Sequence, residues 1–169
     1  MADVLPAFLT SPEIAALRAL AADSTAVAAP GEPASAAGWR PGRQHSGYDI
    51  LPLRAALEAD AALAPLLARA LAQLGTPFED YWDVYLIRYQ DGAHIPPHVD
   101  EAQHGKRHRR INAVLTAADR GGELWIDGRP IELAPGDAVR FFSDREVHAV
   151  TRVEGTRLLF SVGAWIEPD

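Results

Sequence analysis

The sequence predicts an α+β fold that is mainly β, with helices in the first half and an antiparallel barrel or jelly roll in the second. Apolar residues recur at helical spacing before residue 76, which favours helices there. From residue 82 onward, short β-branched and aromatic runs alternate with turn residues, which is typical of antiparallel strands. The length of 169 residues favours one domain. We therefore expect a single domain over 1–169, with helical support and a lid loop in 1–80 and the β core in 81–169.

Composition narrows the function classes. The chain has no cysteine, which excludes disulfides, zinc fingers and thiol nucleophiles. The formal net charge of -7 argues against nucleic acid as a partner, because that binding depends on clustered positive charge. No stretch approaches the roughly 20 apolar residues that span a bilayer, and the N-terminus lacks the basic start of a signal peptide. We expect a cytoplasmic protein with a small-molecule substrate and no membrane partner, and leave its oligomeric state open.

Two helical regions are predicted in the first half. The first covers about 12–22, with Ser11 as N-cap and Pro12 at the first helical position. The second, over 51–75, is one broken helix or two short ones, since Pro52 and Pro65 both suit a first turn and Gly75 suits a C-terminal cap. Its buried stripe is predicted to be Leu53, Leu57, Leu63, Leu67, Leu71 and Leu74.

The segment 24–48 between these helices is rich in Ala, Pro, Gly and Ser and shows no period. Loops of this length are commonly functional lids or disordered segments. We expect a partly ordered loop that closes over a site, with a surface linker as the alternative. The side chains that would serve such a lid are Trp39, Arg40, Arg43, Gln44, His45 and Tyr48.

The strands of the second half are predicted in order along the chain. They are the runs WDVYLIRYQ, RINAVLT, GGELWIDGRPIEL, DAVRFF, EVHAVTRV and TRLLFSVGAWI. Asp127-Gly128 between two short apolar runs is a hairpin signal, and Pro135-Gly136 marks another turn.

Three residues in this half have the chemistry of a metal site. His98 and Asp100 are two positions apart, a spacing that places both side chains on one face of a strand. His148 lies in a later predicted strand, and two imidazoles with one carboxylate suit iron(II) while leaving three coordination positions open. Arg157 follows a turn at Glu154-Gly155, so it is expected on a neighbouring antiparallel strand, where its guanidinium would hold a carboxylate bidentately. An isolated His-x-Asp triplet is more often structural, so the order of all four residues carries the interpretation.

With that order in view, the sequence resembles the iron(II)/2-oxoglutarate-dependent dioxygenases, specifically their prolyl-4-hydroxylase-like branch. The matching text is YLIRYQDGAHIPPHVD, RINAVLTAADRGGELWIDG and LAPGDAVRFFSDREVHAVTRVEGTRLLFSVGAWI. The resemblance implies a double-stranded β-helix, the jelly-roll fold also found in cupins. It implies iron ligands His98, Asp100 and His148, Arg157 paired with the distal carboxylate of 2-oxoglutarate, and Tyr89 lining that pocket. It also implies O2 as cosubstrate, with ascorbate as an optional reductant.

The sequence departs from this family at two places. Many relatives carry an aromatic residue just before the His-x-Asp triplet, where this chain has Ile95-Pro96-Pro97. Some have a cosubstrate-binding tyrosine on the next strand, where the candidates here are Asn112, Val114 and Thr116. The presence of Asp100 favours hydroxylation over halogenation, since related halogenases have a small residue at that position. Desaturation and ring formation stay open, because both begin with the same hydrogen abstraction.

The remaining basic residues surround the triplet. The stretch EAQHGKRHR is expected to be a loop beside the pocket mouth, either solvated or contacting an anionic substrate group. Arg110 is predicted to open the following strand and to point inward toward a substrate carboxylate. Arg43, His45 and Tyr48 are the other predicted substrate contacts. No second metal site is expected, because no second histidine set has a carboxylate beside it.

The sequence leaves four candidate functions for this chain. The leading one is hydroxylation of an unactivated C–H bond of a small molecule, an amino acid or a biosynthetic intermediate, with release of succinate and CO2. The alternatives are hydroxylation of a peptidyl residue and demethylation of a nucleobase. The latter is disfavoured because Arg152 and Arg157 do not match the double-arginine pattern of alkylated-base demethylases. A non-enzymatic cupin-like binder would not need all three predicted ligands and Arg157 together.

Overall fold

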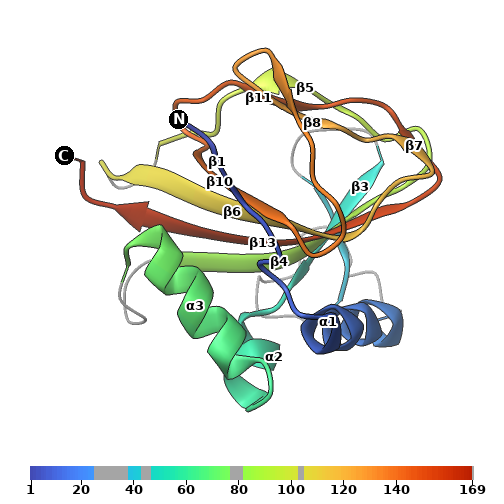
Figure 1. The fold of residues 1–169 in the computed structure, drawn as a ribbon, viewed down its shortest axis with the longest axis vertical. Helices are drawn as coiled ribbons and strands as arrows, with labels where there is room; N and C mark the ends of the chain where they lie inside the picture. The colour runs from blue at the N-terminus through green and yellow to red at the C-terminus, as the bar shows by residue number, and fades with distance from the viewer. Residues whose placement is uncertain (25–37, 43–46, 77–81, 103–104, 169) are drawn as a thin grey trace.

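The computed structural model describes residues 1–24, 38–42, 47–76, 82–102 and 105–168. It consists of two facing β-sheets, with the helices packed against the outer face of the larger sheet (Figure 1). The larger sheet has the order β1-β10-β6-β13-β4-β3-β2 and the smaller has the order β5-β11-β8-β9. The strands of the larger sheet are β1 (Asp3–Leu5), β2 (Arg40–Pro41), β3 (Tyr48–Pro52), β4 (Trp82–Tyr89), β6 (Arg107–Thr116), β10 (Ala138–Phe142) and β13 (Arg157–Ile166).

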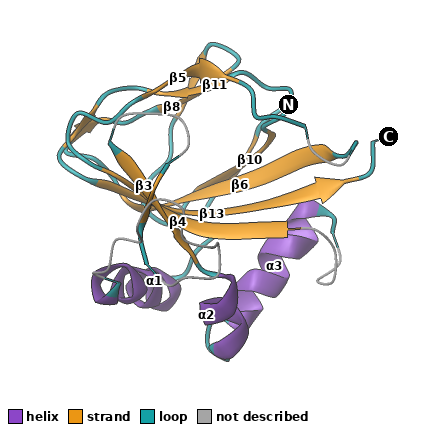
Figure 2. Cartoon of the chain, turned by 180° about the vertical axis from the view of Figure 1, so that it is seen from behind, coloured by secondary structure: helices purple, strands orange, loops and turns teal. Residues whose placement is uncertain are grey.

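The smaller sheet holds β5 (Ile95–His98), β8 (Leu124–Ile126), β9 (Arg129–Ile131) and β11 (His148–Val150), and a separate pair is formed by β7 (Arg120–Gly121) and β12 (Val153–Glu154). Along the chain, β4, β6, β10 and β13 enter the larger sheet, while β5, β8, β9 and β11 enter the smaller one. This antiparallel arrangement is a jelly roll, so the predicted fold class is confirmed. The view from behind in Figure 2 shows the helices lying together below the sheets.

The first helix begins differently from the prediction. Helix α1 (Ser11–Asp23) has Thr10 as its N-cap, so Ser11 lies in the first turn and its prediction as the cap is wrong. The Thr10 hydroxyl accepts from the Glu13 N–H, and the Glu13 carboxylate accepts from the Thr10 N–H at 2.8 Å. This reciprocal capping box satisfies two backbone donors at once, which a serine one position later would not do.

The second helical region forms two short helices, α2 (Arg54–Ala59) and α3 (Ala64–Leu74). Pro65 occupies the first turn of α3, and Gly75 closes it at φ 74°, a left-handed conformation that glycine adopts without strain. Pro52 instead ends β3, so its predicted helical position is wrong. All six leucines of the predicted stripe are buried, with Leu66 and Ala70 beside them.

The core has two parts, one on each side of the larger sheet. One lies between the helices and the outer face of that sheet and includes Leu17, Leu57 and Phe160. The other lies between the two sheets and includes Val114, Phe141 and Leu159. The second part has fewer buried apolar residues, so the space between the two sheets is where a chemical site is to be sought.

The predicted lid is only partly described. Its candidates Arg43, Gln44 and His45 lie outside the described residues. Of the rest, Arg40 and Tyr48 belong to β2 and β3 at the edge of the larger sheet, where a closing loop was expected. Trp39 is buried, with the Arg88 guanidinium 4.1 Å from its ring centre. No helix in the described part of the chain has the length and apolar character needed to cross a bilayer.

Candidate active site

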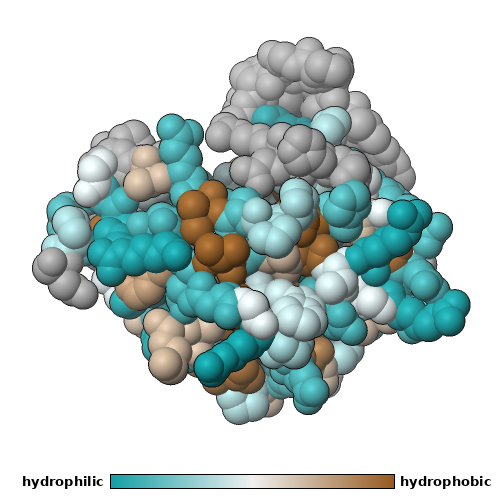
Figure 3. Space-filling model, turned by 90° about the horizontal axis from the view of Figure 1, so that it is seen from above, coloured by the Kyte–Doolittle hydropathy of each residue, from teal (hydrophilic) through white to brown (hydrophobic). Residues whose placement is uncertain are grey.

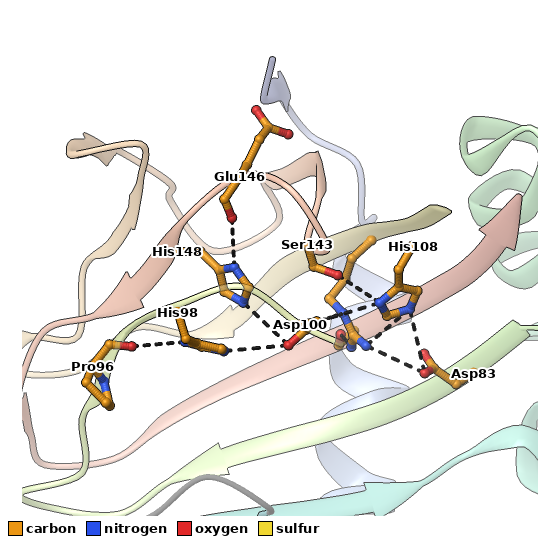
Figure 4. A network of polar contacts seen from close by, with 10 residues as sticks. Asp83, Pro96, His98, Asp100, His108, Ser143, Glu146 and His148 are labelled. Carbon is orange, nitrogen blue, oxygen red and sulfur yellow. Dashed lines mark hydrogen bonds and ion pairs between the residues drawn. The ribbon is translucent and has the colours of Figure 1, made fainter. Parts of the chain in front are cut away.

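Strands β5 and β11 bring His98 and His148 side by side as register partners. Strand β5 ends at His98, so Asp100 lies just beyond it instead of on a continuing strand as expected. The backbone N–H of Asp100 donates to the Ser143 carbonyl at 2.7 Å. This hydrogen bond holds the chain after β5 so that the Asp100 side chain lies toward the two histidines. Figure 4 shows the three side chains pointing toward one another from the inner side of the smaller sheet.

Each histidine is oriented by a backbone carbonyl two residues earlier. The Nδ1 atom of His98 lies 2.9 Å from the Pro96 carbonyl oxygen, and Nδ1 of His148 lies 3.1 Å from the Glu146 carbonyl oxygen. A carbonyl only accepts, so in both rings Nδ1 carries the proton and Nε2 keeps its lone pair. The same local geometry thus prepares both Nε2 atoms as metal donors.

The carboxylate of Asp100 completes a three-donor group. Its Oδ1 lies 3.5 Å from His98 Nε2 and 3.8 Å from His148 Nε2. Two ligands bound to one ion at about 2.1 Å lie at most about 4.2 Å apart, and both distances satisfy this. All three donor atoms lie within 4.8 Å of one another, and this is the one such group among the described residues. Two imidazoles and one carboxylate are the facial donor set of non-haem iron(II).

The surroundings favour the metal-binding protonation state at His148 and Asp100, two of the three donors. Burial lowers the pKa of His148 to about 4, so its imidazole is neutral near pH 7. Burial alone would raise the pKa of Asp100, but the His108 and His98 imidazoles and the Arg110 guanidinium outweigh it and hold that pKa well below the ordinary value. Asp100 therefore stays ionised. The contact with Asp100 raises the pKa of His98 above its ordinary value.

Arg157 has no counter-ion within the part of the chain that the structure describes. It begins β13, which pairs with β4 and β6 in the larger sheet, so it is not on a strand adjacent to β11 as the sequence suggested. Its side chain is buried at 5% exposure, and its Nη1 has no hydrogen-bond partner. Burial lowers its pKa. The guanidinium lies along a cavity of about 780 Å³, also lined by Val114 and Leu124.

Of the other predicted cosubstrate contacts, Tyr89 lies beside this cation, whereas Asn112 lies further along the larger sheet, opposite Ser161 of β13. Tyr89 is the register partner of Arg157, with the guanidinium 5.6 Å from its ring centre. Tyr48 packs against Tyr89 at a centroid distance of 5.6 Å. On β6, Asn112 is buried and its Oδ1 has no hydrogen-bond partner, while Val114 lines the cavity. A buried acceptor without a donor is expensive, so Asn112 is a fitting contact for a bound group.

The basic stretch after the triplet was placed incorrectly. Residues 107–109 are the start of β6, so the predicted loop is too long and Arg110 is the fourth residue of its strand. Arg107 pairs with Asp144 at 2.8 Å, and His108 is buried. The inward direction expected for Arg110 does hold, since its Nη1 donates to Ser161 Oγ at 2.8 Å.

Sequence reasoning missed His108, Asp83 and Ser143, which lie on the side of Asp100 away from His98 and His148 (Figure 4). Ser143 Oγ lies 2.8 Å from His108 Nδ1, and Asp83 Oδ2 lies 3.5 Å from Arg110 Nη2. Strand alternation was the available signal: His108 is two positions from Arg110 and shares its face once the strand is known to begin at 107.

The outer face of the smaller sheet is hollowed and apolar, as the brown surface in Figure 3 indicates. A cavity of about 690 Å³ there is lined by side chains that alternate with the ligands, including Pro97, Trp125, Val147 and Ala149. Because successive side chains on a strand point to opposite faces, this hollow lies on the other side of the sheet from the three donors.

Comparison with known proteins agrees with this geometry. The family model described as the 2OG-Fe(II) oxygenase superfamily matches residues 84–167. A PKHD-type hydroxylase from Maricaulis maris is 34% identical over 91 residues, which cover 49% of this chain and 41% of that relative's length. The chain thus spans less than half of that curated relative.

Two solved structures show the same fold. A prolyl-4-hydroxylase from Pseudomonas putida superposes with a TM-score of 0.67 at 21% identity, over 99% of this chain and 93% of that one. The viral collagen prolyl hydroxylase of Paramecium Bursaria Chlorella virus-1, solved with 2OG, has a TM-score of 0.70 at 13% identity, over 99% and 96% of the two chains.

Proposed function

Because the chain belongs to the 2OG-Fe(II) oxygenase superfamily, we propose that it is an iron(II)/2-oxoglutarate-dependent dioxygenase that hydroxylates an unactivated C–H bond of a small molecule. The products from the cosubstrate are succinate and CO2. The observation that carries this proposal is the convergence of His98 Nε2, His148 Nε2 and Asp100 Oδ1 on one point between the sheets. The second support is Arg157, which lines a cavity and whose buried Nη1 has no hydrogen-bond partner among the described residues.

Each residue has a distinct role in this proposal. His98, Asp100 and His148 hold iron(II), which supplies oxidising chemistry when 2-oxoglutarate and O2 are bound. Arg157 holds the distal carboxylate of 2-oxoglutarate with two parallel N–H donors, and the loss of water around its buried guanidinium strengthens that pair. Tyr89 covers one face of the guanidinium, and the unpartnered Asn112 Oδ1 accepts from a polar group of the bound molecules.

The substrate is proposed to be an amino acid or a biosynthetic intermediate. The side chains of the three donors are 18%, 27% and 11% exposed, in the order His98, Asp100 and His148, so the site is recessed. The apolar hollow that has room for a peptide is on the opposite face of the smaller sheet. Tyr48 remains a predicted substrate contact among the described residues, whereas the guanidinium of Arg110, also predicted to contact the substrate, already contacts Asp83 and Asp100.

The second candidate is a peptidyl residue, favoured by the hydroxylase and prolyl hydroxylases that the chain resembles. Succinate formation stimulated by substrate separates the candidates, with iron(II), 2-oxoglutarate and ascorbate supplied. Free amino acids and small biosynthetic acids form one arm, proline-containing peptides the second, and methylated single-stranded DNA the third.

Stimulation by a free small molecule is expected, and stimulation by peptides alone would overturn the substrate class. The variant His148→Ala should form no succinate in any arm, whereas His94→Ala, at an exposed histidine outside the triad, should behave as wild type. If His148→Ala retained wild-type succinate formation, the proposed function itself would be wrong.

A further inference from the structure

The two oxygens of Asp100 face different environments. Oδ1 faces the Nε2 atoms of both proposed ligand histidines, at 3.5 Å and 3.8 Å. Oδ2 faces away from them, toward His108 Nδ1 at 3.6 Å and Arg110 Nε at 3.9 Å. The carboxylate therefore has one side turned to the ion site and the other side turned to two nitrogen atoms of strand β6.

The proton positions make both of these β6 atoms donors. A guanidinium only donates, and Arg110 Nη2 lies 3.4 Å from His108 Nε2, closer than the accepting Asp83 Oδ2 at 3.9 Å, so we assign Nε2 as the accepting nitrogen of this ring. The ring proton is then on Nδ1, where it points toward Ser143 Oγ and Asp100 Oδ2. Arg110 Nε is buried without a hydrogen-bond partner and faces the same oxygen.

These donors are themselves held rigidly. His108 is 3% exposed and stacks on Trp165 at a centroid distance of 4.5 Å with an interplanar angle of 14°. The Ser143 N–H donates to the His108 carbonyl at 3.0 Å, while the Ser143 carbonyl accepts from the Asp100 N–H at 2.7 Å. A side chain at Gly163 would meet His108 Nε2 at 2.5 Å, so the backbone of β13 also leaves the ring no room to move toward it.

The metal site is thus assembled from both sheets. His98 and His148 come from the smaller sheet, where backbone carbonyls of that sheet's own segments orient them. Asp100 is tied to the larger sheet, through its backbone to Ser143 and through Oδ2 to His108 and Arg110. The distance between the carboxylate and the two imidazoles therefore depends on this attachment.

We propose that His108 and Arg110 are positioning residues that retain Oδ2 of Asp100, so that the carboxylate offers only Oδ1 to a divalent ion. This inference rests on the proposed function, because it assumes the three-donor site. Single-oxygen coordination leaves three positions open, as cosubstrate and O2 binding require. Without the retaining donors the carboxylate is free to turn, which moves Oδ1 away from the two imidazole nitrogens.

The simpler role for His108 is that of a satisfied core histidine, stacked on Trp165 and bonded to Ser143. That role predicts an effect on folding stability and none on metal affinity. Arg110→Met does not separate the two roles, since it leaves two carboxylates without their counter-charge and is expected to destabilise the fold. His108→Phe is the better test, because a phenyl ring keeps the stack and removes both nitrogens.

The experiment titrates metal-free protein with Mn²⁺ alone, without 2-oxoglutarate or O2, and follows binding by calorimetry. Outer partners of metal ligands commonly change metal affinity by about 10–100-fold, and His108→Phe is expected to weaken Mn²⁺ binding by that amount. His108→Asn, whose amide nitrogen occupies the place of Nδ1, is expected to recover most of the affinity. His94→Phe is the matched control, at an exposed histidine outside the proposed site, and should bind as wild type.

The outcomes separate this inference from the function beneath it. If wild type and His108→Phe bind Mn²⁺ with the same affinity, the positioning role is wrong, whatever happens to the melting temperature. If His108→Asn binds no better than His108→Phe, the donor at Nδ1 is not the cause and the inference is also overturned. Failure of the wild-type protein to bind Mn²⁺ at all would instead refute the three-donor site.

Discussion

Arg157 and Arg110 occupy the same inner face of the larger sheet and are both mostly buried, yet their charges are handled in opposite ways. Arg110 has Asp83 at 3.5 Å and Asp100 at 3.9 Å, and donates to Ser161 at 2.8 Å. Burial opposes its charge, but the two carboxylates raise its pKa above the ordinary value. Arg157 has no carboxylate within ion-pair distance in the described part of the chain, and burial lowers its pKa.

The presence of carboxylate partners at Arg110 and their absence, among the described residues, at Arg157 indicate different roles for the two guanidinium groups. A buried cation with its counter-ions in place contributes to the structure that surrounds it, whereas one without a counter-ion carries an unrelieved desolvation cost. A buried charge of this kind is typical of a binding site, where the bound ligand supplies the missing counter-ion. Arg110 already contacts Asp83, Asp100 and Ser161, which favours a structural use of that residue, whereas Arg157 Nη1 has no hydrogen-bond partner among the described residues and is available to an incoming carboxylate.

The largest effect is expected from removing the compensated charge. Arg110→Met leaves Asp83 and Asp100 without their counter-ion, and breaking a buried ion pair from one side costs about 3 kcal/mol. The free energy of unfolding of metal-free protein, measured by urea denaturation at neutral pH, should fall by that amount. A decrease below about 0.5 kcal/mol, the range of ordinary surface substitutions, would show that Arg110 is not held by these carboxylates.

Removing the charge of Arg157 should affect ligand binding and leave stability intact, the reverse of the effect at Arg110. Arg157→Met is expected to leave the stability of metal-free protein unchanged or higher, because it removes a buried cation that has no anionic partner. Its binding of 2-oxoglutarate, measured by calorimetry on Mn²⁺-loaded protein, should weaken about 100-fold, or about 2.7 kcal/mol, since a buried charge pair is lost.

Arg152→Met is the control for that measurement. Arg152 lies five residues earlier, beside the apolar outer hollow, and should have no effect on 2-oxoglutarate affinity. Equal affinity in wild type and Arg157→Met would remove the proposed role of Arg157.

A smaller effect is expected from Tyr89, which lies beside Arg157. Burial raises the pKa of Tyr89 from 10.0 to about 12, although Arg157 opposes the shift. The folded state therefore holds the phenolic proton more tightly than the unfolded chain, so this stabilisation is complete below about pH 10 and is lost as the pH rises toward 12. Tyr89→Phe has no such proton, and its stability should decline less steeply than that of wild type over this alkaline window. Parallel declines would contradict the buried position of the hydroxyl.

Much of this comparison was accessible from the sequence. The order His98, Asp100, His148 and Arg157 predicted a metal site with a deeper guanidinium, because ligand chemistry and strand periodicity constrain those positions strongly. The Asp127-Gly128 hairpin was also predicted correctly: both residues have positive φ, 48° and 74°, as a tight two-residue turn requires.

What the sequence did not predict depended on contacts between distant segments. The start of β6 at Arg107 is fixed by its pairing with β13 along the full strand, including Ile166 with Arg107, and a basic stretch gives no local sign of that. For the same reason His108 was assigned to a loop. The N-cap of α1 was different, because its signal was local: the Thr10-x-x-Glu13 pattern marks a capping box. The prediction instead followed Pro12 and placed the cap one residue later, at Ser11.

The most direct test of the whole account is an anaerobic iron(II) titration of wild type, His148→Ala and Asp100→Ala. The three donors are predicted to share one ion, so wild type should bind one iron(II) per chain, and each variant should lose at least about 10-fold in affinity, or about 1.4 kcal/mol. His148→Ala binding iron(II) as tightly as wild type would contradict the convergence of β5 and β11 on a single metal ion.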